Sequence, residues 1–315
     1  MKNALKSIQD CPERGIRNLI DMALQFSKGR FQQNFFLAAQ TMLQNENSAY
    51  YRLVRDLISY TDLNRLYTFG MNVGYNGCTV GAKRIRENEK RMGCHIPWTV
   101  LFQLDGTHFG ENRPRYEAAL REGENLGIYV WLLFAGTCPQ NALALAEGHT
   151  DSAFCIFCRP EDLSGQFLNE AGDLPHVMLV PRYQENAPER YRQLRDRGLL
   201  YSVWYPYSAR DVRPIQNGDL FCSLQQVSPA FAVLLPEPDC PEEAQQAAYQ
   251  AIRQARMEQT YHTLLWELPR DNGSIDRAIS EGGRALCFDG KLNVRGAGRQ
   301  PQSLFQHSLS EILLL

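Results

Sequence analysis

Seven residues that could take part in chemistry each lie at or just after the end of a short apolar run of the sequence. Asp105 and His108, a carboxylate and an imidazole three residues apart, could act as an acid–base pair or as two metal ligands. The set matches no standard catalytic triad and no metal-binding spacing, so it predicts a polar pocket without defining a reaction. The seven are Asp105, His108, Cys138, Arg182, Tyr205, Glu237 and Glu267.

A metal site at Asp105 and His108 would need a third ligand, for which Glu237, Glu267 and His176 are the candidates. The sequence does not place any of these three beside the pair. A polar residue at the end of a strand more often caps a helix or simply ends the strand. We favour that interpretation for Asp105 and His108, and we predict no metal site.

Cys155 and Cys158 have the spacing of a redox or metal-binding motif. Such a motif normally lies in a loop or at the start of a helix, with further ligands nearby. Here both thiols belong to an apolar run, where cysteine behaves as a small hydrophobic residue. We therefore predict two buried structural thiols.

From residue 96 onward, short apolar runs alternate with amphipathic segments, which is typical of parallel strands covered by helices on both faces. We predict an α/β protein with a partial (β/α) barrel of TIM-barrel type over residues 96–270. A helical N-terminal region precedes it over residues 1–95, and residues 271–315 form a C-terminal extension with a β-hairpin at Asp289-Gly290. In such barrels the chemistry lies at the carboxyl ends of the strands. The predicted strands are Trp98–Leu104, Ile128–Phe134, Ala153–Phe157, His176–Val180, Leu199–Tyr205, Ala230–Leu235 and Thr263–Leu268.

Glycine marks several boundaries in this pattern. Gly127 and Gly198 each come just after a predicted helix and before a strand, where a C-cap is expected. The glycine-rich stretch from Phe69 to Gly81 is predicted to be irregular.

The amphipathic segments after this stretch are predicted helices. They are Ala82–Met92, Arg113–Leu126, Asn141–Glu147, Glu161–Glu170, Pro188–Arg197 and Glu242–Met257.

Composition excludes several classes of protein. The 33 Lys and Arg against 35 Asp and Glu give a formal net charge of −2, which argues against binding nucleic acid through a basic face. No apolar run approaches the roughly 20 residues that span a bilayer, and the charged segment 1–17 is unlike a signal peptide. Nine scattered cysteines in that setting predict reduced thiols and a cytoplasmic protein.

Six groups of short motifs, spread over nearly the whole chain, resemble a known family. They are Asn72-Val73-Gly74-Tyr75-Asn76 with Gly81, His95-Ile96-Pro97-Trp98, Asn125-Leu126-Gly127-Ile128-Tyr129, His149-Thr150-Asp151 with Phe154 and Leu163, Leu194-Arg195-Asp196-Arg197-Gly198-Leu199-Leu200-Tyr201, and Gly282-Gly283-Arg284 with the Asp289-Gly290 turn. The family is the radical S-adenosylmethionine (radical SAM) superfamily, and in particular its larger members with a C-terminal SPASM-like extension that carries cysteines. The resemblance implies the same partial β/α barrel.

The chain departs from this family at each cofactor site. The resemblance implies a [4Fe–4S] cluster held by a C-x-x-x-C-x-x-C motif after the first strand, but here that loop is Asp105-Gly106-Thr107-His108-Phe109-Gly110-Glu111-Asn112, without cysteine. The Gly-Gly-Glu-Pro motif that meets S-adenosylmethionine is replaced by Gly136-Thr137-Cys138-Pro139. Two cysteines of the extension are replaced by Ile279 and by Arg295 or a neighbour. We therefore predict loss of both the cluster and the S-adenosylmethionine site, and no cofactor.

An alternative is a cluster held by other thiols. Cys78, Cys138 and Cys158 could converge in the fold, with His108 as a further ligand. A cluster needs three or four thiolates in fixed geometry, and no spacing in the chain calls for this set.

Two functions remain. The first is a pseudoenzyme without an iron–sulfur cluster that acts as a binding or accessory protein, as partner of an active paralogue. It predicts an exposed apolar patch near Trp204, Tyr205 and Tyr207 or at Leu313–Leu315. The second is a repurposed barrel that binds a small molecule or does cluster-free chemistry at the strand ends. It predicts a closed pocket with convergent polar groups.

Overall fold

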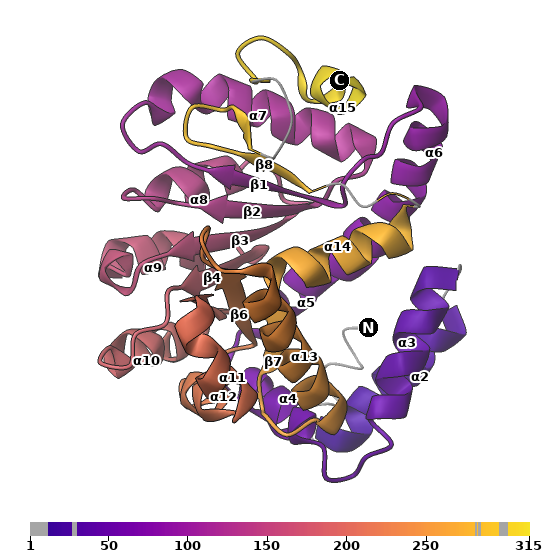
Figure 1. Cartoon of the computed structure of the whole chain (residues 1–315), viewed down its shortest axis with the longest axis vertical. Helices are drawn as coiled ribbons and strands as arrows, with labels where there is room; N and C mark the ends of the chain where they lie inside the picture. The colour runs from indigo at the N-terminus through magenta and orange to yellow at the C-terminus, as the bar shows by residue number, and fades with distance from the viewer. Residues whose placement is uncertain (1–11, 27–29, 281, 283–284, 296–301) are drawn as a thin grey trace. The chain divides into compact units, whose positions relative to one another are not determined.

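The computed structural model describes residues 12–26, 30–280, 282, 285–295 and 302–315 (Figure 1). Its strands are β1 (Thr99–Gln103), β2 (Val130–Phe134), β3 (Ala153–Cys158), β4 (Val177–Pro181), β5 (Val203–Tyr207), β6 (Phe231–Pro236), β7 (Leu264–Glu267), β8 (Leu286–Phe288) and β9 (Val294–Arg295). Its α-helices are α2 (Pro12–Phe26), α3 (Arg30–Met42), α4 (Ala49–Tyr60), α5 (Leu63–Met71), α6 (Ala82–Met92), α7 (Phe109–Leu126), α8 (Gln140–Ala146), α9 (Gly165–Gly172), α10 (Pro188–Asp196), α11 (Val212–Gln216), α12 (Asp219–Gln225), α13 (Glu242–Glu258), α14 (Leu268–Ile279) and α15 (Leu309–Leu314). A π-helix, η1 (Asn72–Gly81), and two 3₁₀ turns, η2 (Pro160–Asp162) and η3 (Ala209–Asp211), complete the set.

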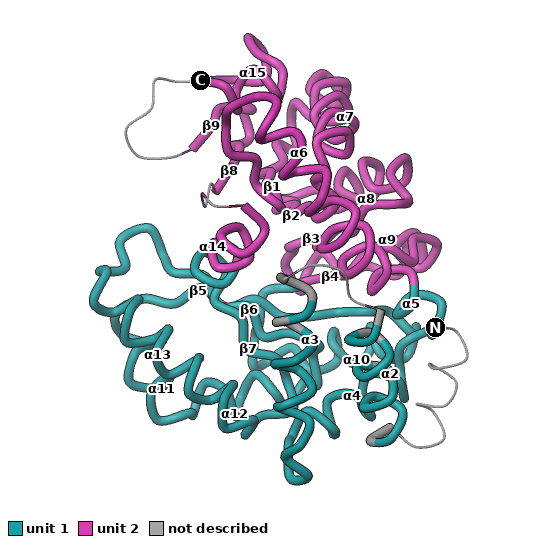
Figure 2. Tube along the Cα trace, turned by 90° about the vertical axis from the view of Figure 1, so that its right-hand side faces the viewer, with its two compact units in different colours: residues 1–67, 181–271 teal, residues 68–180, 272–315 magenta. Residues whose placement is uncertain are grey.

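The chain divides into two compact units, each built from two separate stretches of sequence (Figure 2). Unit 1 contains residues 1–67 and 181–271, and unit 2 contains residues 68–180 and 272–315. In unit 1 the strands belong to the second stretch, whereas in unit 2 both stretches contribute strands to one sheet. No helix in the described part of the chain is both long enough and apolar enough to cross a membrane.

Unit 2 is organised around a six-stranded sheet in the order β4-β3-β2-β1-β8-β9. Strands β1 and β2 are parallel, from Thr99 opposite Val130 to Gln103 opposite Phe134, and β2 pairs with β3 in the same sense. Every residue of β3 and β4 is buried, as expected for parallel strands covered on both faces. Helices α7, α8 and α9 follow one another along this sheet (Figure 1). The carboxyl ends of β1 and β2 therefore meet at one edge.

The core of unit 2 contains a cluster of fully buried aromatic rings around Phe102 of β1. Its ring stacks on Trp131 of β2 at 6.0 Å and on Phe288 of β8 at 5.2 Å, between centroids. The ring of Tyr116 from α7 meets it edge-on at 5.3 Å. These contacts tie the helix after β1, and the C-terminal strand β8, to the middle of the sheet.

Unit 1 contains a three-stranded parallel sheet in the order β5-β6-β7. Val203 lies opposite Ala232 and Phe231 lies opposite Leu264, so the three strands end side by side. Arg182 forms a further parallel bridge to Trp204, and the N–H of Tyr183 donates to the Trp204 carbonyl at 2.7 Å.

The predicted mixed α/β fold with parallel strands is confirmed. All seven predicted strands are present, although the fifth begins at Val203, four residues later than predicted. Gly127 is the C-cap of α7, with φ of 110°, as predicted, whereas the C-cap of α10 is Arg197 and Gly198 follows it with φ of 66°. The partial barrel of TIM type stays a prediction, since the hydrogen-bonded strands form two separate sheets.

The expectation of irregular structure from Phe69 to Gly81 is wrong. Residues Asn72–Gly81 form the π-helix η1, and the N–H of Ala82 still donates to the carbonyl of Gly77, five residues earlier. Two glycines of this helix, Gly77 and Gly81, are closely packed: a Cβ on Gly77 would lie 3.3 Å from the Val130 side chain, and one on Gly81 would lie 2.7 Å from the Asn76 carbonyl. The glycines that suggested irregular structure therefore belong to a helix, and Gly77 packs it against β2 of the sheet.

The predicted hairpin is confirmed. Strands β8 and β9 are antiparallel, with Cys287 opposite Arg295 and Phe288 opposite Val294. The turn closes through the N–H of Asp289 and the carbonyl of Asn293, at 2.9 Å. Gly283 and Arg284 of the preceding motif lie outside the described residues.

Candidate functional site

At the strand ends of unit 2, Asp105 and His108 are in direct contact. Asp105 Oδ2 lies 2.8 Å from His108 Nδ1, while Asp105 Oδ1 accepts a hydrogen bond from the N–H of Thr107 at 2.8 Å. His108 precedes α7 but makes no capping bond with its side chain. Both oxygens of the carboxylate are therefore engaged, one by the imidazole and one by the main chain.

This contact favours the charged form of both groups. The hydrogen bond from His108 lowers the pKa of Asp105, and the same bond raises the pKa of His108. The side chains are 26% and 59% exposed respectively, so the pair is solvated. A solvated carboxylate–imidazole pair can bind an anion or exchange a proton with a ligand.

Cys138, the third predicted site residue of unit 2, lies in the loop after β2 beside the loop that carries this pair. A Cβ on Gly106 would lie 3.3 Å from Cys138 Cβ. On another side of the same loop, a Cβ on Gly290 of the hairpin turn would lie 3.3 Å from Asp105 Cβ. The loop after β1 is thus in contact with both the loop after β2 and the hairpin turn.

At the strand ends of unit 1, Tyr207 and Glu267 meet in the interior. The Tyr207 hydroxyl donates to Glu267 Oε1 at 3.0 Å, and the N–H of Arg270 donates to Glu267 Oε2 at 2.8 Å. Both residues are completely buried. Burial raises the pKa of Glu267 because the carboxylate loses its hydration. Burial and the neighbouring Glu267 raise the pKa of Tyr207.

Tyr205 binds a carboxylate that the sequence analysis did not single out. Its hydroxyl donates to Asp211 Oδ1 at 2.9 Å, while Asp211 Oδ2 accepts from the N–H and the hydroxyl of Ser208. Ser208 and Asp211, three residues apart, form a capping box, and this spacing is a readable signal. Burial and Asp211 raise the pKa of Tyr205 to about 12, so its hydroxyl stays protonated at neutral pH.

The last two predicted residues, Arg182 and Glu237, both contact residues of β5. The guanidinium of Arg182 lies over the ring of Trp204, 5.7 Å from its centroid. Glu237 is exposed, and its N–H donates to the Tyr207 carbonyl at 2.8 Å. Unit 1 therefore carries Tyr205, Glu237 and Glu267 in or just after its strands and Arg182 opposite Trp204, near the start of β5, whereas unit 2 carries Asp105, His108 and Cys138.

The prediction for Cys155 and Cys158 is confirmed, because both thiols are buried in β3. Burial raises the pKa of Cys155 to about 12 and also raises that of Cys158. Burial raises the pKa of Cys78, in η1, to about 11. Within the described residues, no group of three or more His, Cys, Asp or Glu side chains is arranged to hold a metal ion.

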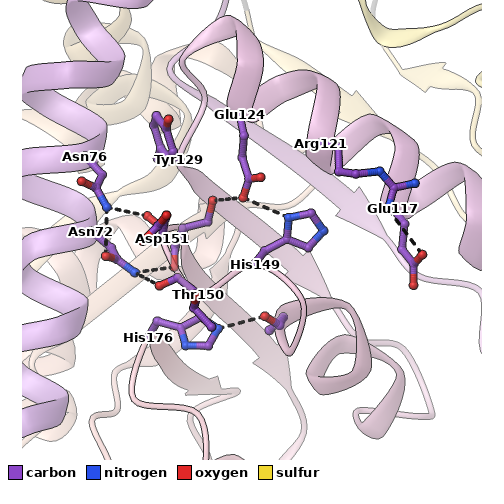
Figure 3. Close-up of polar contacts among 12 residues, drawn as sticks. Asn72, Asn76, Glu117, Arg121, Glu124, Tyr129, His149, Thr150, Asp151 and His176 are labelled. Carbon is purple, nitrogen blue, oxygen red and sulfur yellow. Dashed lines mark hydrogen bonds and ion pairs between the residues drawn. The ribbon is translucent and has the colours of Figure 1, made fainter.

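Two of the motif groups that resemble the radical SAM family, Asn72–Asn76 and His149–Asp151, meet in one hydrogen-bond network (Figure 3). Asn72 of η1 donates through Nδ2 to the carbonyls of Thr150 and Ser152, both at 2.8 Å. Asn76, one turn later, donates to Asn72 Oδ1 at 3.1 Å and to the Asp151 carbonyl at 2.8 Å. The network fastens η1 to the segment that leads into β3.

A second part of the network holds the same segment from the side of α7 (Figure 3). Glu124 Oε1 accepts from the Ser152 hydroxyl at 2.6 Å and lies 3.0 Å from His149 Nδ1. His176, a third-ligand candidate from the sequence, bonds instead to the Ala146 carbonyl at 2.9 Å. Glu124 thus links two side chains that precede β3, and His176 satisfies a main-chain carbonyl at the end of α8.

The apolar patch expected of a docking protein is present only in part. Tyr207 and Leu313 are buried, and Trp204 and Tyr205 are half-buried. Leu314 and Leu315 are exposed, at 56% and 63%.

Comparison with known proteins gives matches at the level of structure alone. A scan against protein-family models finds no match, nor does a search of curated protein sequences. Among solved structures, the chain is similar to Streptococcus suis SuiB, a radical SAM enzyme. With SuiB bound to the precursor peptide SuiA the TM-score is 0.54, with 9% identity over 74% of this chain and 68% of SuiB. With SuiB bound to S-adenosylmethionine the TM-score is 0.54, with 9% identity over 74% of this chain and 67% of SuiB. With SuiB alone the TM-score is 0.51, with 10% identity over 93% of this chain and 77% of SuiB. The chain shares the radical SAM fold.

The residues after β1 do not fit the cluster that the radical SAM fold implies. The connection from β1 to α7, Leu104–His108, contains no cysteine, and its carboxylate and imidazole bind each other. The neighbouring loop after β2 offers one thiol, Cys138, whereas a [4Fe–4S] cluster needs three or four. These two loops therefore do not match the ligand set of such a cluster, and loss of the cluster stays a prediction.

Proposed function

We propose that this chain uses the radical SAM fold without an iron–sulfur cluster, as a binding or accessory protein that partners an active paralogue. One observation carries the proposal. The loop after β1 has no thiol, and its only pair of ionisable side chains, Asp105 and His108, is satisfied internally at 2.8 Å. The loop after β2, which carries Cys138 where the family motif has a glutamate, supports the same conclusion. No cofactor is then required.

A second candidate function is the binding of a small molecule at the strand ends of unit 1. It is favoured by the buried Tyr207–Glu267 contact, a protonatable carboxyl at the carboxyl end of parallel strands. The nearby Glu237 and Arg182 would add charged groups for recognition. A ligand that carries hydrogen-bond donors and acceptors is the class that such groups would take.

The first test is anaerobic reconstitution with iron and sulfide, followed by counting both elements and by calorimetry with S-adenosylmethionine. A cluster-bearing radical SAM enzyme is reconstituted in parallel as the positive control. We expect iron near zero and no heat of binding for this chain. About four irons per chain, the content of one [4Fe–4S] cluster, would refute the cluster-free proposal. Cys78→Ser, Cys138→Ser and Cys158→Ser would then identify the ligands.

The second test separates the two functions. His108→Ala and Glu267→Gln should leave the affinity for the partner protein within about twofold, because both groups bond within the chain. A ligand site at the strand ends of unit 1 would instead lose most of its affinity in Glu267→Gln while His108→Ala binds normally. Loss of partner binding in both folded variants would contradict the accessory role as stated.

A further inference from the structure

A polar cleft of about 790 Å³ lies within unit 1, away from every residue singled out as a candidate site. It is formed where α4 ends and turns into α5, where α10 ends, and at the loop before β6. Because Gly198 precedes β5 and Ser228 precedes β6, the cleft lies at the amino ends of these strands. Its lining is Asp56, Ser59, Tyr60, Thr61, Asp62, Arg195, Asp196, Arg197, Gly198 and Ser228.

Hydrogen bonds hold the walls of this cleft in place. The Tyr60 hydroxyl donates to the Ser228 carbonyl at 2.9 Å, and the N–H of Asp62 donates to the Gly198 carbonyl at 3.0 Å. Arg195 Nη1 donates to the Val227 carbonyl at 2.7 Å. Each bond joins segments that are far apart in sequence, so the cleft exists before any ligand arrives.

The lining carries both signs of charge. Asp56 is paired with Arg52, outside the lining, at 3.7 Å, and Arg195 donates to the Tyr201 hydroxyl and the Val227 carbonyl. Among the described residues, none of the ion pairs within 4.0 Å joins an arginine of the lining to one of its aspartates. Asp62, Asp196 and Arg197 are exposed, and Arg195 is half-buried. The C-terminal end of α10 adds partial negative charge beside Asp196.

We propose that this cleft binds a small zwitterion through its ammonium and carboxylate groups. The aspartates would receive the ammonium, and the arginines, whose planar donors match a carboxylate, would receive the carboxylate. A ligand with one sign of charge would use only the aspartates or only the arginines of the lining. The volume is within the range of small-molecule pockets. A free amino acid and a short peptide with free ends share this chemistry.

The experiment uses the full chain and isothermal titration calorimetry with three matched probes. They are glycylglycine, N-acetylglycylglycine without the ammonium, and glycylglycine amide without the carboxylate. We expect glycylglycine to bind about tenfold more tightly than either blocked form, the effect of one lost charge-assisted contact. Titration with glycine then distinguishes the two sources. If the natural ligand is a free amino acid, glycine should bind as tightly as glycylglycine; if it is a peptide, glycine should bind more weakly than glycylglycine.

Two variants assign the charges. In Asp196→Asn the preference for glycylglycine over its N-acetyl form should disappear, and in Arg197→Gln the preference over the amide should disappear. Asp173→Asn and Arg121→Gln, exposed residues outside the lining, serve as matched controls. Circular dichroism confirms that all four fold. No binding of any probe, equal binding of all three, or unchanged preferences in the two variants would each overturn the proposal.

Discussion

Gly81 and Gly127 face each other so closely that neither position has room for a side chain. A Cβ on Gly81 would contact the Gly127 carbonyl and would lie 2.7 Å from the Asn76 carbonyl and 3.0 Å from the Tyr129 ring. A Cβ on Gly127 would lie 2.5 Å from the Gly81 carbonyl. The contact joins the end of η1 to the end of α7 within unit 2.

Alanine at Gly81 should therefore destabilise the protein. We expect a loss of about 3 kcal/mol, because the added methyl meets main-chain atoms that cannot move aside cheaply. Gly74→Ala is the matched control, since it lies in the same π-helix and a Cβ there would meet nothing within 4 Å. That variant should be neutral or slightly more stable. Urea unfolding of the two variants measures the difference, and equal stabilities would show that the close contact is absent.

The strands were predictable from sequence, and the packing of the glycine-rich segment was not. Apolar runs such as Ala153–Phe157 carry their own signal, because a strand buried on both faces must be apolar throughout. The segment Asn72–Gly81 carries several glycines, and the sequence alone does not distinguish a flexible stretch from one packed against Gly127. The structure of this segment depends on the contact of Gly81 with Gly127, 46 residues later, and a local sequence pattern cannot predict that contact.

The grouping of the candidate site residues was predictable only in part. The rule that parallel strands end at one edge predicted a shared location for these residues, and Tyr205 and Glu267 lie on the two outer strands of one sheet, both opposite Leu234 of β6. It did not anticipate that Glu267 bonds to Tyr207, or that Asp211 binds Tyr205, because both depend on side-chain directions. The polar cleft near Asp196 was missed because its lining joins residues of three separate segments.

A buried carboxyl, Asp276, should make the stability of the protein depend on pH. It accepts a hydrogen bond from the N–H of Trp98 at 2.8 Å and is 3% exposed. Burial raises its pKa from 3.8 to about 7, with a further contribution from Glu89 and opposing ones from Trp98 and Arg277. The folded state then holds a proton that the unfolded chain releases. Stability from this group is therefore greatest below about pH 4 and is lost as pH rises to about 7.

Asp276→Asn tests this directly, because asparagine can still accept the Trp98 hydrogen bond and does not ionise. We expect the variant to gain stability over the wild type as pH rises from 5 to 8, with a total change on the order of 3 kcal/mol. The free energy of unfolding in urea, measured for both proteins at each pH, gives the difference in stability between the variant and the wild type. Arg277→Gln, which removes an exposed charge nearby, should change the profile far less. A stability difference between variant and wild type that stays constant from pH 5 to pH 8 would contradict the raised pKa of Asp276.

The Tyr207–Glu267 contact should also contribute to stability. Tyr207→Phe removes the donor and leaves a fully buried carboxyl with one hydrogen bond fewer, at a cost of about 1–3 kcal/mol. Because the lost bond favours the ionised carboxylate, the pKa of Glu267 should rise further in the variant. The deficit relative to wild type should therefore grow as pH rises through the pKa of Glu267.

Tyr205→Phe, on the same strand β5, is the matched control, since it removes a hydroxyl that donates to Asp211 of η3. Asp211 keeps its two bonds from Ser208, and Tyr205 is only half-buried, so the expected loss is about 1 kcal/mol or less. Unfolding in urea at pH 5 and pH 8 compares the two variants. Two outcomes would contradict this prediction: equal losses of stability in the two variants, or a loss in Tyr207→Phe that becomes smaller as pH rises. Either would mean that the Tyr207 hydrogen bond does not stabilise an ionised Glu267. The buried carboxyl would then lose its place as the chemical centre of the alternative small-molecule site.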